Sequence, residues 1–405
     1  MHFKYCLIHN FLNKILLDFE WSIKLNRFGL YLIGLWPECH EKDKNNFLLN
    51  IYVSFIFIMI NFVCTVPLIC SLVQVWGDMI LMIDNLQMTL SIIVASLKLI
   101  IIRWKRSTLS LIVNMMVEDW MYLRVDAERN VMIKRAQVAR LIAICGYLIT
   151  IFGFLTTIVL PLFGLQYRFL TNITDSGKVL PLQAYYFYDT DKSPQFEFTL
   201  AAQAVTMFLL LVIYTSVDAF FGLMIFYMCG QLENFRYRLL HLTSYNDFDN
   251  ALRYNIETHL RLIRFADNIE DVFTLLVLIL LFYFSIVFCF PMVTLITSDE
   301  LNDTSFSRMG FTALAITNLF GHTFLYCGGG ELVANECKAV YRVMCDLKWY
   351  KLEPRKSRAL ILIMIRTSEP FRITAGKIVP LSLATFSSLL KTCVGYISFL
   401  LAKHD

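Results

Sequence analysis

Charged residues are scarce in this chain, and no stretch of it has the composition of a soluble domain. Asp, Glu, Lys and Arg make up 17% of the 405 residues, whereas hydrophobic residues make up 57%, and the mean hydropathy is +0.59. Soluble domains carry about 25% charged residues. We therefore expect a single integral membrane domain, which is all-helical because a lipid-exposed backbone must satisfy its own hydrogen bonds.

The chain also lacks the cysteine and histidine patterns of metal sites and enzymes. It has no CxxC pair and no HExxH motif, so we expect no metal, no cofactor and no catalytic site. None of its eleven cysteines lies in the loops 164–199 and 298–308, which argues against a disulfide framework. No inverted internal repeat of the kind found in many secondary transporters is visible.

A signal peptide is missing as well. Residues 1–46 contain no clean apolar core segment and no small-residue cleavage site, so we expect a cytoplasmic N-terminal segment and no cleaved leader. Leu7, Phe11, Ile15 and Phe19 recur every four residues. This spacing predicts an amphipathic helix at the membrane interface.

Long apolar runs, by contrast, are abundant. Seven of them are each long enough to cross a hydrocarbon core of about 30 Å as a helix. They cover residues 47–69, 80–102, 138–163, 200–228, 272–297, 309–330 and 380–401.

The basic residues between these runs alternate in number. The segments 1–46, 103–137, 229–271 and 331–379 hold 28 of the 36 Lys and Arg residues, and the other connecting segments hold five. Since basic residues stay cytoplasmic, we expect seven transmembrane helices with the N-terminus inside and the C-terminus outside. The net charge of +4 then reflects topology and does not indicate nucleic-acid binding.

Two N-x-[ST] sequons, at Asn172 and Asn302, fall in loops that this topology places outside, so both are candidate glycosylation sites. On the cytoplasmic side, an apolar stripe of Leu252, Ile256, Leu260 and Ile263 predicts an amphipathic helix. The apolar pattern of the segment 331–379 likewise predicts amphipathic helical structure. Each apolar face packs either on its own bundle or on a neighbouring subunit.

The last apolar run carries small and hydroxyl-bearing side chains at steps of three and four residues, which place them on one helix face. Such a face can line a water-filled pore or let helices pack closely, and the pattern leaves both open. Lys391 lies at the edge of the stripe. The stripe consists of Thr385, Ser388, Thr392, Gly395, Phe399 and Ala402.

A ligand cavity is expected between the outer halves of the second to sixth runs. Apolar and aromatic walls with a few hydroxyls suit a small volatile hydrophobic molecule, although ordinary core residues fit the same pattern. The candidates are Met88, Ile92, Tyr147, Thr150, Phe154, Met207, Leu211, Phe282 and Tyr283.

A few ionisable residues lie within the apolar runs. Asp218 is deep in the fourth run, where a polar pair inside the bundle is favoured over a ligand contact. Asp84 and Lys98 lie near opposite ends of the second run, so we expect both to reach the membrane interface. We expect His322 to be a hydrogen-bonded packing residue rather than a metal ligand.

The C-terminal run from Pro380 to Thr392, followed by Tyr396, Ser398 and Leu400, resembles the signature of the insect odorant receptors. The resemblance extends over nearly the full length of the chain. It includes the supporting matches Gly34 to Pro37, Ile256 with His259, Trp349-Tyr350, Arg366, Pro370 and Thr374 to Lys377.

This resemblance implies a ligand-gated, non-selective cation channel that needs no G protein. The last helices of four subunits would line a shared pore with an outer gate near Phe399, where the family usually has small aliphatic or amide side chains. Residues 47–330 would form the six-helix ligand-binding bundle, 331–379 the assembly segment and 380–405 the pore helix. The partner would be the common odorant co-receptor, in the plasma membrane of olfactory sensory neuron dendrites.

Other classes with several membrane helices fit less well. A G-protein-coupled receptor needs an outside N-terminus and an Asn-Pro pair in its last helix, and this chain has neither. A gustatory-type channel of the same inverted class would show Thr-Tyr and Gln-Phe where Thr392-Cys393 and Ser398-Phe399 stand. It remains the alternative, and a secondary transporter is less favoured.

Overall fold

The computed structural model describes residues 2–37, 43–123, 125–163, 177–242, 247–290, 303–347 and 349–404, most of which are helical. In chain order the helices are α1 (His2–Leu32), α2 (Asp43–Ile60), a π-helical turn (Asn61–Thr65), α3 (Val66–Gln74), α4 (Met79–Trp104), α5 (Arg106–Tyr122), α6 (Asp126–Leu162), α7 (Gln195–Leu240), α8 (Phe248–Val287), α10 (Asp303–Asp346), a 3-10 turn (Trp349–Lys351), α11 (Pro354–Thr367) and α12 (Leu383–His404). Strands β1 (Thr374–Ala375) and β2 (Val379–Pro380) form an antiparallel hairpin between α11 and α12.

Five of the predicted spans correspond to helices that are long and apolar enough to cross a membrane. These are Phe47–Gln74, Met79–Trp104, Asp126–Pro161, Gln195–Leu240 and Phe248–Val287. The sixth and seventh predicted spans fall largely within α10 and α12. Several helices run well past the predicted span ends, because hydropathy marks only the apolar part of a helix whose hydrogen bonding continues into polar sequence.

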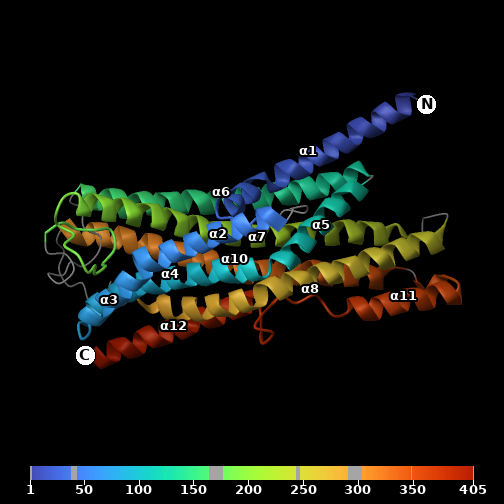
Figure 1. Cartoon of the computed structure of the whole chain (residues 1–405). Coiled ribbons are helices and arrows are strands. Elements are labelled where there is room, and N and C mark those ends of the chain that lie inside the picture. Colours follow the sequence, from blue (N-terminus) through green and yellow to red (C-terminus); the bar gives the residue numbers. More distant parts are fainter. Residues whose placement is uncertain are drawn as a thin grey trace.

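Helix α7 is the centre of the bundle. Every residue from Thr215 to Leu232 is buried, as expected of a helix that is apolar on all sides. Helices α6 and α10 make its most extensive contacts, and α1, α4 and α8 also pack on it. Figure 1 shows these long helices running roughly along one another.

The predicted N-terminal amphipathic helix is α1, but its apolar face packs on the bundle instead of lying free at the interface. Ile15 and Phe19 are buried, and α1 contacts α5, α6 and α7. Arg129 of α6 donates to the Asp18 carboxylate through Nε at 2.7 Å. The side chains of Leu7 and Phe11 lie outside the described residues.

Ion pairs join three helices at the end of the bundle where the basic segments gather. The Arg135 guanidinium of α6 lies 2.7 Å from Glu233 of α7 and 2.6 Å from Glu336 of α10. Arg238 of α7 pairs with Glu128 of α6 at 2.5 Å. These charge-assisted contacts fix the relative heights of α6, α7 and α10.

The first half of α8 does not bury the apolar stripe that the sequence predicts. Leu252 is buried, but Ile256 and Leu260 are 37% and 51% exposed. Asn255 and His259 are buried in their place. The bundle covers a face of α8 that is rotated about the helix axis from its apolar face. Apolar surface on α8 therefore remains uncovered in the single chain.

His259 occupies an aromatic site at this end. Its ring stacks on Phe235 at 5.4 Å between centroids and on Phe371 at 6.0 Å. Burial, and to a smaller extent the nearby Arg366 guanidinium, lowers the pKa of His259 from 6.5 to about 4. The imidazole is therefore neutral near pH 7.

The hairpin before α12 is fixed to α8. Gly376 and Lys377 have φ angles of +61° and +59°, and the glycine supplies a conformation that other residues adopt at a cost. The backbone N–H of Gly376 donates to the carbonyl oxygen of Thr274 at 3.0 Å. The hairpin thus sets the starting position of α12.

Candidate functional site

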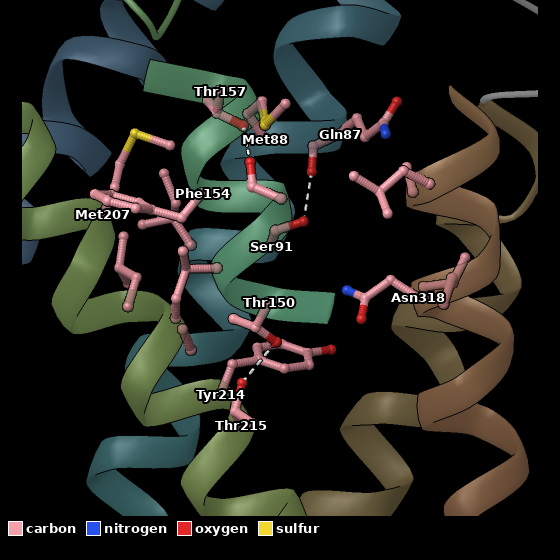
Figure 2. Close-up of a pocket in the computed structure, with 18 of the residues that line it drawn as sticks. Gln87, Met88, Ser91, Thr150, Phe154, Thr157, Met207, Tyr214, Thr215 and Asn318 are labelled. Atoms are coloured by element: carbon pink, nitrogen blue, oxygen red, sulfur yellow. Dashed lines mark hydrogen bonds between the residues drawn. The ribbon is translucent and has the colours of Figure 1, made fainter. Parts of the chain in front are cut away.

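A cavity of about 230 Å³ lies inside the bundle among α4, α6, α7, α8 and α10. Figure 2 shows side chains from α4, α6, α7 and α10 gathered around it. Seven of the nine residues predicted to contact a ligand line this space. They are Met88, Ile92, Thr150, Phe154, Met207, Leu211 and Tyr283.

The walls are mainly apolar, and most hydroxyls at the walls are bonded within the protein. Thr150 and Thr215 share a hydrogen bond of 2.9 Å between their hydroxyls. Ser91 and Tyr283 do the same at 2.7 Å. A wall of this kind accommodates a small, largely apolar molecule with few polar groups.

Two predicted cavity residues lie elsewhere. The Tyr147 hydroxyl is bonded to Ser216 at 2.9 Å and faces Gly29 of α1, where a Cβ would clash with it at 2.2 Å. Phe282 is 66% exposed on the outside of α8. Successive helical residues point about 100° apart, and on α8 this places Tyr283 at the cavity and Phe282 on the outer face.

Sequence reasoning missed several lining residues. Gln87 and Ser91 of α4, Tyr214 of α7, and Asn318 of α10 all line the cavity. The signal was available in the spacing: each lies three, four or seven residues from another lining residue on its own helix.

A buried polar cluster borders the cavity. Asp218 of α7 is contacted by Lys98 Nζ of α4 at 2.5 Å and by His322 Nδ1 of α10 at 2.6 Å. The Tyr326 hydroxyl donates to Asp218 Oδ1 at 2.5 Å. Lys98 Nζ also lies 3.4 Å from the ring centroid of Tyr214. His322 and Tyr214 line the cavity, so the cluster and the cavity share a wall.

This cluster corrects one expectation and fits two others. Lys98 does not reach the membrane interface, because its side chain is only 1% exposed and is paired with Asp218. Asp218 forms the polar pair expected of it, and His322 packs against that pair with its Nδ1 atom 2.6 Å from the carboxylate. Within the described residues no group of three potential ligands capable of holding a metal ion is found.

Helix α12 leaves its hydroxyl stripe uncovered in the single chain. Ser388, Lys391, Thr392 and Gly395 are exposed, and Thr385 is half-buried. A Cβ on Gly395 would meet nothing within 4 Å. The side chains of Phe399 and Ala402 lie outside the described residues, as do both sequon asparagines, Asn172 and Asn302.

The opposite face of α12 packs on α8 and α10. Phe386 contacts the rings of Phe320 and Phe324 at 6.1 and 5.9 Å between centroids. A Cβ on Gly330 would lie 2.4 Å from the Leu381 carbonyl oxygen. A glycine at this position allows α10 and the start of α12 to approach closely.

Comparison with known proteins identifies the family. The family model described as 7tm Odorant receptor matches residues 78–394. Odorant receptor 22c of Drosophila melanogaster is 28% identical over 201 residues, which cover 46% of this chain and 48% of that protein. The match thus spans about half the length of that relative. Odorant receptor 85b of the same fly is 23% identical over 75% of this chain and 77% of its own length.

Solved structures show the same fold. The insect olfactory receptor OR5 from Machilis hrabei matches with a TM-score of 0.80 at 19% identity, covering 94% of this chain and 97% of that one. Its complex with eugenol gives the same TM-score at 18% identity, covering 95% and 98%. The relatives found are odorant and olfactory receptors, not enzymes. The family model covers well over half of the sequence, and the chain therefore belongs to the 7tm odorant receptor family.

Proposed function

We propose that this chain is the ligand-tuning subunit of a heteromeric, ligand-gated, non-selective cation channel that detects small volatile hydrophobic molecules. The observation that carries the proposal is that α10 serves both the cavity and α12. Asn318 and His322 line the cavity, while Phe320 and Phe324 of the same two turns contact Phe386 of α12. The eugenol complex of the related OR5 supports odorant detection.

The proposed topology has seven membrane helices, with the N-terminus in the cytoplasm and the C-terminus outside. The alternation of basic segments supports it. The five helices that satisfy the length and hydropathy requirements support the helix count in part. In this topology the cluster of ion pairs around Arg135 lies in the cytoplasm, while Asn172 and Asn302 lie outside and are available for glycosylation.

We assign α12 to the pore. Its exposed stripe faces away from the subunit's own bundle, where three further subunits of a tetramer would supply the remaining walls. Lys391 at the edge of that stripe is costly in lipid but acceptable beside water. The gate belongs at the outer end, near Phe399 and Ala402.

We assign the cytoplasmic end to assembly with the common co-receptor in the plasma membrane of sensory dendrites. Large apolar side chains remain exposed there on α8 and α11. They are Ile256, Leu260, Leu362 and Ile365. Such surface is normally covered in the assembled protein.

Electrical recording from cells that lack olfactory proteins tests this function. The chain expressed with the co-receptor should give odorant-evoked cation currents within milliseconds and without added nucleotide, whereas the chain alone should conduct poorly. Large currents from the chain alone would refute the heteromer. Currents abolished by blocking G proteins would refute direct gating.

A cavity variant ties the current to the site. Replacing Leu211 with Trp fills part of the cavity. The odorant concentration needed for a half-maximal current should therefore rise. Phe282→Trp on the outer face of α8 is the matched control and should leave it unchanged. Equal effects of the two substitutions would remove the cavity from the assignment.

A further inference from the structure

Two hydrogen-bonding side chains at the cavity wall have unused capacity. Asn318 and His322 are four residues apart on α10, so they lie on one face of that helix. Figure 2 shows the Asn318 amide pointing into the open space between α10 and the facing helices. Within the described part of the chain the structure gives this amide no hydrogen-bond partner.

The neighbouring hydroxyls, in contrast, are fully used. Ser91 donates to the carbonyl oxygen of Gln87 at 2.7 Å, so the Tyr283 hydroxyl is the donor in its 2.7 Å contact with Ser91. Each hydroxyl has a single hydrogen to donate. These two donations, which end on a carbonyl, leave neither the Ser91 nor the Tyr283 hydrogen for a ligand.

The cluster around Asp218 fixes what His322 can offer. Lys98 Nζ lies 2.5 Å from Asp218 Oδ1, so the carboxylate already has a cationic partner. The His322 Nδ1 atom lies 2.6 Å from the other carboxylate oxygen of Asp218, Oδ2. In an imidazole whose Nδ1 carries the hydrogen, Nε2 is the hydrogen-bond acceptor.

We propose that this wall selects odorants carrying one hydroxyl group, which donates to His322 Nε2 and accepts from the Asn318 amide. The inference rests on the proposed function and names the ligand class of that cavity. A hydroxyl satisfies both side chains, an ether or ketone can only accept from Asn318, and a hydrocarbon leaves both unpaired. A cationic amine is disfavoured, because Lys98 lies against the Tyr214 ring of the same wall.

The test uses matched trios of an alcohol, its methyl ether and the parent hydrocarbon on an aromatic, a linear and a terpenoid skeleton. Currents are recorded from the chain with the co-receptor. We expect each alcohol to act at a concentration about 3- to 10-fold lower than its ether, which is the range of one net hydrogen bond. The hydrocarbon should be weaker than both.

Two variants separate recognition from folding. Asn318→Leu should abolish the preference for ether over hydrocarbon and weaken the preference for alcohol. His322→Asn keeps a donor for Asp218 but loses the Nε2 acceptor, so it should remove the preference for alcohol over ether. The matched control is Thr317→Val, because Thr317 is exposed and bonds its own helix at Ala313; its ranking should equal that of the wild type.

Different results would overturn the proposed ligand class and the proposed function. Equal responses of the wild type to all three members of a trio would overturn the inference and leave the proposed function intact. An unchanged ranking in Asn318→Leu would also overturn it. Responses to none of the trios, with the complex present at the cell surface, would overturn the proposed function and the inference together.

Discussion

Removal of the Asp218 carboxylate is the sharpest test of the polar cluster. In Asp218→Asn the ammonium of Lys98, only 1% exposed, would lose the carboxylate that lies against it. Breaking a buried ion pair in this way costs about 3–5 kcal/mol. At about 1.4 kcal/mol per factor of ten, the unfolding equilibrium should shift by roughly 10²- to 4 × 10³-fold.

The assay is the thermal stability of the detergent-purified protein, followed by size-exclusion chromatography after heating. Glu257→Gln is the matched control, since it removes a carboxylate from an exposed pair with Arg253, whose side chain is 79% exposed, and should cost at most about 0.5 kcal/mol. The double variant Asp218→Asn with Lys98→Met removes both charges at similar volume and should regain most of the stability. If Asp218→Asn proved as stable as the control, or the double variant no better than the single one, the reasoning would be refuted.

Three further outcomes follow from the packing of α8, α10 and α12. Gly330→Val places a branched side chain where a Cβ would already lie 2.4 Å from the Leu381 carbonyl oxygen, so it should impair surface expression or gating, whereas Gly310→Val, with nothing within 4 Å of its Cβ, should not. Because the pKa of His259 is lowered to about 4 from an ordinary 6.5, the unfolded state binds the proton first, and stability should be lost as pH falls from 6.5 towards 4. His259→Phe should flatten that part of the pH profile of thermal unfolding, and an unaltered profile would contradict the assignment. Substitutions of Phe399 should change ion permeability more than odorant ranking, as measured from reversal potentials; unchanged permeation would remove this residue from the gate.

The sequence predicts helices and their apolar cores well, because hydropathy and helical spacing are properties of the chain itself. For the same reason, the sequence predicts seven of the residues that line the cavity. Rotations about helix axes were harder to foresee. Phe282 and Tyr283 are adjacent and equally suited to a wall, and only the packing of α8 decides which one faces inward.

Pairings between distant residues were also beyond sequence reasoning. Lys98 and Asp218 are 120 positions apart, and nothing in the local sequence of either indicates the other as its partner. The buried face of α8 at Asn255 and His259 is a similar case, since the partner rings come from α7 and the segment after α11. Such contacts depend on the relative height of helices, which ion pairs at their far ends help to set.

Helix α10 carries a mechanical consequence. Its 44 residues form one helix between Asp303 and Asp346, a rod about 66 Å long at 1.5 Å per residue. Over this length, a tilt of about one degree at one end displaces the other end by about 1 Å. If odorants act through this helix, the current that they evoke depends on where along α10 they make contact as much as on how tightly they bind.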